Sequence, residues 1–370
     1  MKLILLAAPV LLFTALASAQ TPTPTPQPSA SPSPSATPTA TPTPTPVPPT
    51  AREIINVLSD SQLQQAIQSL RANFLDAART DDRELRRATL EGLIDRLAPG
   101  IAVTTEAAVK QSRASFPFLA EILDGRIGYL RLGMLNKEAL AQMDAAIANF
   151  NAKGLKAVIL DLRGEPASEN YEAAAEVAKR FCPKGRLLFS IQKPSAKQER
   201  ILISDRDPAF SGILVVLTDR ENAGGTEALA ATLRKNANAM IVGAATRGET
   251  VEFSDVPLGD GKILRVAVAQ VALADSGPIF PAGVKPDIAA ALAAADQARI
   301  FSLSKDRGVS SFVFESERPH LNEASLVSNT NPEIDPAVLR QSGNGVLWDT
   351  VLQRAVDLVT AISFYNDHGK

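Results

Sequence analysis

Histidine and cysteine are nearly absent from this sequence of 370 residues. The single cysteine, Cys182, excludes an internal disulfide and a zinc site built from cysteines. The two histidines, His320 and His368, are too few for a His-rich metal site and leave little for a Ser-His-Asp triad. We therefore expect no metal and no cofactor, and we expect Cys182 to be a small, buried, unreactive side chain.

Neither sign of charge dominates, and long hydrophobic runs are missing after the N-terminus. The 38 Lys and Arg residues balance 40 Asp and Glu residues, for a formal net charge of −2. A nucleic-acid-binding protein would show a basic excess, so nucleic acid is not expected as a partner. Hydrophobic residues make up 45% of the chain, which is enough for a globular core.

The first residues have the pattern of a signal peptide spanning residues 1–19. Lys2 supplies a positive charge, residues 3–16 are mainly apolar, and Ala17-Ser18-Ala19 provides small residues at a cleavage site. The apolar stretch is shorter than the roughly 20 residues of a membrane-spanning helix. We therefore expect a bacterial protein exported to the periplasm or beyond, starting at Gln20 and soluble, with no membrane span after cleavage.

Residues 20–50 form a linker in which Pro alternates with Thr, Ser and Ala. Prolines at this spacing exclude helices and inner strands, because each lacks an N–H donor and has a fixed φ. An extended polyproline-like tether is compatible with the composition. A spacer that holds the globular part away from a surface and a low-complexity leader without a role both remain open.

The remaining chain predicts an α/β fold between two helical regions. Apolar residues at helical spacing indicate a helical region at 51–115, with one stripe formed by Leu63, Ile67, Leu70 and Phe74. Alternating strand and helix patterns predict a core at 116–290, and a C-terminal helical extension follows at 291–370. The expected core strands are Arg126–Leu132, Lys156–Leu162, Arg186–Ile191, Ile213–Thr218, Ala239–Gly243 and Ile263–Val271, and the helices begin after Asn136, at Tyr171 and at about Thr226.

Three motifs in this core resemble those of tail-specific, or C-terminal-processing, proteases. They are IGYLRL at 127–132, LDLRGEPAS at 160–168 followed by GGTEALAA from 224, and VGAATRGE at 242–249 leading to FPAGVKPDI at 280–288. The resemblance implies the fold of that family, with repeated strand-helix units. The PDZ module usual in the family is not expected, because Pro99 and Asp124 are only 124 − 99 = 25 positions apart.

The resemblance also implies where the catalytic groups of a Ser/Lys peptidase would lie, and those groups are missing. The family's nucleophilic serine corresponds to Gly224 and its lysine base to Glu249, and the separation of 249 − 224 = 25 residues agrees with the family. Ala167 and Ser168 stand where the family has a pair of glycines in its oxyanion loop. A serine peptidase needs both a nucleophilic oxygen and a base to activate it.

We therefore expect an exported pseudoprotease that binds peptide or unfolded protein segments without cutting them. Two alternatives stay open. One is a divergent serine-type peptidase with weak residual activity, for which Thr226 is the rescue candidate because it is the nearest hydroxyl to Gly224. We expect Thr226 instead to be the N-cap of the helix that follows. The other is a structural partner of an active paralogue.

Overall fold

The computed structural model describes residues 50–110, 116–165, 168–274, 276–314 and 347–368. The predicted signal peptide and all but the last residue of the predicted linker lie outside these ranges. The chain divides into two compact units, Met1–Ala77 and Ala78–Lys370. None of the helices described is both long enough and apolar enough to cross a membrane.

The described part of the first unit consists of two capped helices, α1 (Ala51–Asn56) and α2 (Asp60–Asn73). In α1 the side chain of Thr50 accepts from the backbone of Glu53, whose carboxylate accepts from the backbone of Thr50, and Ser59 begins a similar capping box in α2. The predicted helices are thus confirmed. Neither helix buries a residue within the chain.

The second unit contains the remaining helices and all the strands described. Its helices are α3 (Asp82–Leu97), α4 (Glu106–Lys110), α5 (Lys137–Ala152), α6 (Tyr171–Ala178), α7 (Gly225–Asn236), α8 (Ala294–Arg307) and α11 (Thr350–His368), and short 3-10 helices lie at Pro194–Ala196 and Ser310–Phe312. A third short 3-10 helix, Ala77–Thr80, begins at the last residue of the first unit. Its strands are β1 (Ile101–Thr105), β2 (Leu119–Leu123), β3 (Ile127–Arg131), β4 (Ala157–Asp161), β5 (Leu187–Lys193), β6 (Gln198–Ile203), β7 (Ile213–Thr218), β8 (Met240–Gly243), β9 (Val251–Gly259), β10 (Lys262–Leu273), β11 (Gly277–Pro278) and β12 (Ile288–Ala289).

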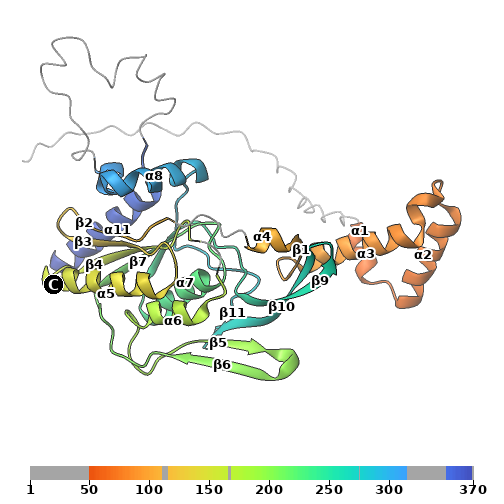
Figure 1. The fold of residues 1–370 in the computed structure, drawn as a ribbon, viewed down its shortest axis with the longest axis horizontal. Helices are drawn as coiled ribbons and strands as arrows, with labels where there is room; N and C mark the ends of the chain where they lie inside the picture. Colours follow the sequence, from red (N-terminus) through yellow and green to blue (C-terminus); the bar gives the residue numbers. More distant parts are fainter. Residues whose placement is uncertain (1–49, 111–115, 166–167, 275, 315–346, 369–370) are drawn as a thin grey trace, which may run out of the picture. The chain divides into compact units, whose positions relative to one another are not determined.

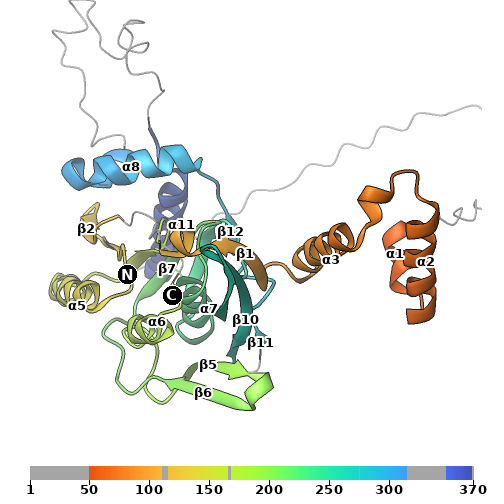
Figure 2. The same cartoon turned by 45° about the vertical axis from the view of Figure 1, so that its right-hand side comes forward.

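The central sheet has the strand order β12-β8-β7-β4-β3-β2. All neighbouring pairs are parallel except β2 with β3, which are antiparallel. From β3 to β12, the strands of this sheet follow one another across it in chain order. Helices α5 to α7 cover one face of this sheet and α11 covers the other (Figures 1 and 2). Both faces of the inner strands are covered, which agrees with the apolar runs that make up most of β4 and β7.

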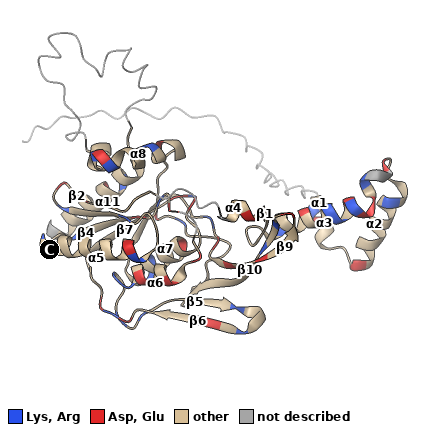
Figure 3. Cartoon of the chain, viewed as in Figure 1, with Lys and Arg blue, Asp and Glu red and all other residues tan. Residues whose placement is uncertain are grey.

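Alternate residues of each central strand enter two different cores. Val158 and Leu160 of β4 face α5 to α7, whereas Ala157 and Ile159 face α11. Phe150 of α5 belongs to the first core. Charged side chains lie mainly outside these strands, and both signs are interspersed along α3 and α8 (Figure 3).

The second sheet has the order β1-β10-β5-β6, and β9 and β11 also pair with β10. We did not predict β1, β2, β6 or β9 from the sequence. β6 (QERILI) begins with three polar residues, and β9 contains Pro257, so neither shows the alternation of a typical strand along its whole length. Their partners decide their conformation, since β9 pairs along most of its length with β10.

The other expected elements are confirmed with small shifts of their ends. Asn136 caps α5 by accepting from the backbone N–H of Ala139 at 2.8 Å. The C-terminal helical extension expected at 291–370 begins with α8 at Ala294, after residues 288–289 pair as β12 with β8. Cys182 is fully buried as expected, and burial raises the pKa of its thiol to about 12. The α/β fold class is confirmed.

Candidate active site

Three loops meet at the carboxyl ends of neighbouring strands and carry the predicted site positions. β4, β7 and β8 are adjacent and parallel, so the loops that leave them share one edge of the sheet. The loop after β4 contains Ser168, the loop after β7 leads through Gly224 into α7, and the loop after β8 contains Glu249. Ala167 lies outside the described residues. Ser168 and Gly224 meet directly, as an isolated parallel bridge.

Gly224 is the N-cap of α7, and the carbonyl of Ser168 occupies the space beside it. The φ and ψ of Gly224 are +62° and −122°, a left-handed conformation that favours glycine. A Cβ placed on Gly224 would lie 2.3 Å from the carbonyl oxygen of Ser168. That oxygen also accepts from the backbone N–H of Gly225, the first residue of α7, at 2.7 Å. The nucleophile position thus has no side chain and no room for one.

Glu227 ties the first turn of α7 to the turn that carries Glu249. Its carboxylate accepts from the hydroxyl of Thr246, from the backbone N–H of Gly248 at 2.7 Å and from that of Glu249 at 2.9 Å. Its side chain is fully buried. Desolvation raises the pKa of Glu227, and the hydrogen bonds from Thr246, Gly248 and Glu249 oppose this effect. We made no prediction for Glu227 from the sequence, although its position beside Thr226 in the motif placed it near the predicted site.

The carboxylate of Glu249 faces a cation rather than a group that it could activate. It lies 3.4 Å from Arg247, which in turn forms an ion pair with Glu221 at 2.8 Å. The side chains of Glu249 and Arg247 are about one-quarter exposed, at 25% and 26%. The structure therefore brings Glu249 to the same end of α7 as Gly224, but as a member of a surface ion-pair network.

Thr226 lies inside the protein and is not the helix cap that we expected. Its side chain is fully buried, and its hydroxyl donates to the carbonyl of Ala223 at 3.1 Å. The N-cap expectation was wrong because Gly224 occupies that position, and α7 starts without a capping side chain. Residues two apart on a helix point to different faces, so Thr226 does not replace a side chain at Gly224.

A buried ion-pair network supports the loop after β4, and the sequence did not reveal it. Arg163, only 1% exposed, binds Asp161 at 2.6 Å and Asp349 at 2.8 Å. Tyr129 donates its hydroxyl to Asp161 at 2.8 Å. The two flanking carboxylates raise the pKa of Arg163 despite its burial. The network connects the LDLR motif to Asp349, the residue preceding α11. In the sequence, only the charged pair Asp161 and Arg163 at the end of an apolar run pointed to such a network.

Two further acids lie beside this network. Asp219 accepts from the backbone N–H of Gly164 and from the amide of Gln297, each at 2.8 Å, and so connects the loops after β4 and β7 to α8. Glu165 is only 3% exposed, and its oxygens have no hydrogen-bond partner among the described residues. Burial, followed by the charges of Asp161 and Asp219, raises the pKa of Glu165 to about 8. Around pH 7 this side chain is therefore mostly a neutral acid.

Within the part of the chain that the structure describes, no group of three His, Cys, Asp or Glu side chains is arranged to hold a metal ion. The chemical capacity of the site follows from its polar groups. Carboxylates and backbone donors are present, but the described hydroxyl nearest to Gly224 along α7 already donates to a carbonyl. Among the described residues, this arrangement connects the three loops at one edge of the sheet.

The sequence model of peptidase family S41 matches residues 126–290. The chain has no match among curated proteins. Among solved structures, it is similar to the photosystem II D1 C-terminal processing protease, with 22% identity over 57% of this chain and 53% of that one and a TM-score of 0.41. It is also similar to a Bacteroides fragilis protein assigned to the S41 proteases, with 19% identity over 59% of each chain and a TM-score of 0.42. A Parabacteroides merdae protein assigned as a peptidase has 16% identity over 72% of this chain and 89% of that one, with a TM-score of 0.48.

The chain thus spans between half and three-fifths of the length of the first two structures. The family match covers the same stretch as the three motifs, from β3 to β12, and includes the loops that carry Gly224 and Glu249. It confirms the resemblance to tail-specific proteases. Residues 126–290, somewhat less than half of the chain, are thus similar to peptidase family S41.

Proposed function

We propose that this protein is an exported, catalytically inactive member of peptidase family S41 that acts by binding protein segments. The observation that carries the proposal is the carbonyl of Ser168, which lies where a side chain at Gly224 would have to be. Export is supported by the signal-peptide pattern of residues 1–19.

The loss of activity has two independent physical causes. Gly224 offers no oxygen for attack on a peptide carbonyl. In addition, serine peptidases stabilise the developing oxyanion with backbone N–H donors, and the N–H of Gly225 at the start of α7 already donates to Ser168 at 2.7 Å. Gly224→Ser and Glu249→Lys together would restore the two side chains, but the new Cβ at 224 would lie 2.3 Å from the carbonyl oxygen of Ser168 and would disturb the start of α7, so we expect no turnover from the double variant.

Binding of a peptide as an added strand is hindered near this site. β9 pairs only with β10 in the described chain and is therefore an outer strand, the type to which peptides add. However, the backbone N–H of Phe253 in β9 already donates to the carboxylate of Glu169 at 3.3 Å. Pro257, four residues on, has no N–H. A binding role therefore needs a surface elsewhere on the domain.

The two alternatives are distinguished by hydrolysis and by co-purification. Residual activity through Thr226 is disfavoured, because its hydroxyl is buried and donates to Ala223. A structural partner of an active paralogue would also have no catalytic groups. It would form a stable complex with a second S41 protein, whereas a binder of protein segments would not require one.

The decisive experiment measures proteolysis and active-site labelling by the mature protein. We expect no hydrolysis of fluorescein-casein and no labelling by a fluorophosphonate probe. Hydrolysis that survives further purification and is abolished by Thr226→Ala would refute the proposal. Thr232→Ala is the matched control, because Thr232 is equally buried in α7 and its hydroxyl also donates to a backbone carbonyl, that of Ala228 at 2.7 Å.

A further inference from the structure

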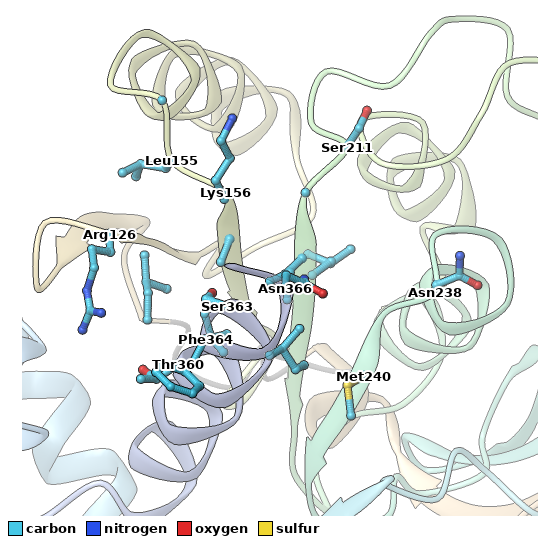
Figure 4. Close-up of a pocket in the computed structure, with 18 of the residues that line it drawn as sticks. Arg126, Leu155, Lys156, Ser211, Asn238, Met240, Thr360, Ser363, Phe364 and Asn366 are labelled. Carbon is cyan, nitrogen blue, oxygen red and sulfur yellow. The ribbon is translucent and has the colours of Figure 1, made fainter. Parts of the chain in front are cut away.

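A large pocket lies at the opposite edge of the central sheet from the candidate active site. It is formed by the first residues of β3, β4, β7 and β8 together with the last turns of α11, and its volume is about 1110 Å³ (Figure 4). The candidate site is at the carboxyl ends of the same strands. The two sites are therefore separated by the length of the parallel strands.

The lining of this pocket is cationic. Arg126, Lys153 and Lys156 line it, and none of the described residues that line it is acidic. Lys153 and Lys156 are exposed and form no ion pair with another described residue, while Arg126 pairs with Asp124 in solvent. The C-terminal ends of α5, α7 and α11 contribute about half a negative charge each. The two lysines, with two full positive charges, outweigh these helix ends.

A second cavity of about 930 Å³ lies against the same turns of α11 and is more apolar. It shares Arg126, Thr360 and Phe364 with the first, and Asp357 is its only acidic lining residue among those described. Phe364 and Tyr365 are 64% and 72% exposed at this surface. Aromatic side chains and Arg are enriched at protein interfaces.

We propose that this surface, the α11 groove, binds an acidic segment of another protein that also carries apolar side chains. Tyr365 is the apolar anchor, and Lys153, Lys156 and Arg126 pair with the acids of the segment. The inference rests on the binding role proposed above, but not on the loss of catalysis. It places that role on a surface remote from Gly224.

Two other occupants fit the groove less well. The two cavities together exceed the roughly 300–1,000 Å³ of a small-molecule site, so a single small anion would leave most of the surface uncovered. A second copy of the chain, related by a two-fold axis, would bring each protomer's patch against itself. Lys153 and Lys156 would then face like charges, which opposes association.

The test is a binding titration with the mature protein and a fluorescein-labelled peptide of about 12 residues that alternates pairs of Glu with Phe or Leu. The control peptide has every Glu replaced by Lys. We expect saturable fluorescence anisotropy with the acidic peptide only, weakened by salt. Lys153→Glu with Lys156→Glu should weaken binding at least about tenfold, and Tyr365→Ala should also weaken it. Lys184→Glu with Lys197→Glu is the control pair, because both lysines are exposed outside the groove.

Three results would overturn the proposal. The first is equal binding of the acidic and the basic peptide. The second is an equal loss of peptide affinity in the groove and control variants, measured on variants whose melting temperature is unchanged. The third is binding of anilinonaphthalene sulfonate without binding of the acidic peptide at about 1 mM. Sedimentation that shows a dimer disrupted by Tyr365→Ala would assign the groove to a second copy instead. Mass spectrometry of the peptide after incubation separates the two proposals, because a cleaved peptide contradicts only the inactive site.

Discussion

Introducing the family's serine at Gly224 should destabilise this protein rather than activate it. The new Cβ would lie 2.3 Å from the carbonyl oxygen of Ser168, on a backbone with a φ of +62°. A side chain in such a conformation costs about 1–3 kcal/mol. Moving the carbonyl away removes its hydrogen bond from Gly225 and leaves a buried donor unpaired, which costs about 1–3 kcal/mol more. We expect a total loss of about 3 kcal/mol for Gly224→Ser.

The matched control is Gly185→Ser, because Gly185 has a φ of +80° and no atom within 4 Å of an added Cβ. It should cost about 1–2 kcal/mol through its conformation alone. Urea denaturation measures both free energies of unfolding, and the melting temperature of Gly224→Ser should be lower than that of the control by about 5 °C. Equal stability of the two variants would refute the argument that Ser168 closes the site, and labelling of Gly224→Ser by a fluorophosphonate probe would do so too.

Three further predictions concern the buried charges and the N-terminus. Asp349→Ala should lower the free energy of unfolding by about 3–5 kcal/mol, because it leaves Arg163 with one of its two buried carboxylates. Asp255→Ala removes only a partly exposed ion pair and should lower it by less than about 1 kcal/mol in the same denaturation assay. Burial raises the pKa of Glu165 from 4.5 to about 8, so the folded state holds this proton more tightly than the unfolded state. The free energy of unfolding should therefore fall as pH rises from about 4.5 to 8. Glu165→Gln should remove up to about 4 kcal/mol of that fall, and parallel curves of stability against pH for the two proteins would contradict the burial. N-terminal mass spectrometry of the secreted protein should find Gln20 first, and an intact Met1 would exclude export by cleavage.

The local elements were largely predictable from the sequence. The apolar run that forms β4 and the Asn136 cap of α5 were identified because their signals lie within a few neighbouring residues. β6 and β9 were missed, since their polar sequences become strands only by pairing with β5 and β10. The exposure of the N-terminal helices was not predictable either, because an amphipathic stripe does not specify what covers it.

The sequence alone determined that a glycine stands at 224 and a glutamate at 249, the positions predicted for the family's nucleophile and base, because these are matters of residue identity. Only the tertiary structure decided what stands in their place. The carbonyl of Ser168 reaches Gly224 across 224 − 168 = 56 residues, and Arg163 meets Asp349 across 186. The α11 groove likewise combines the starts of four strands with a C-terminal helix. Such contacts depend on the packing of distant segments, so no local pattern in the chain encodes them.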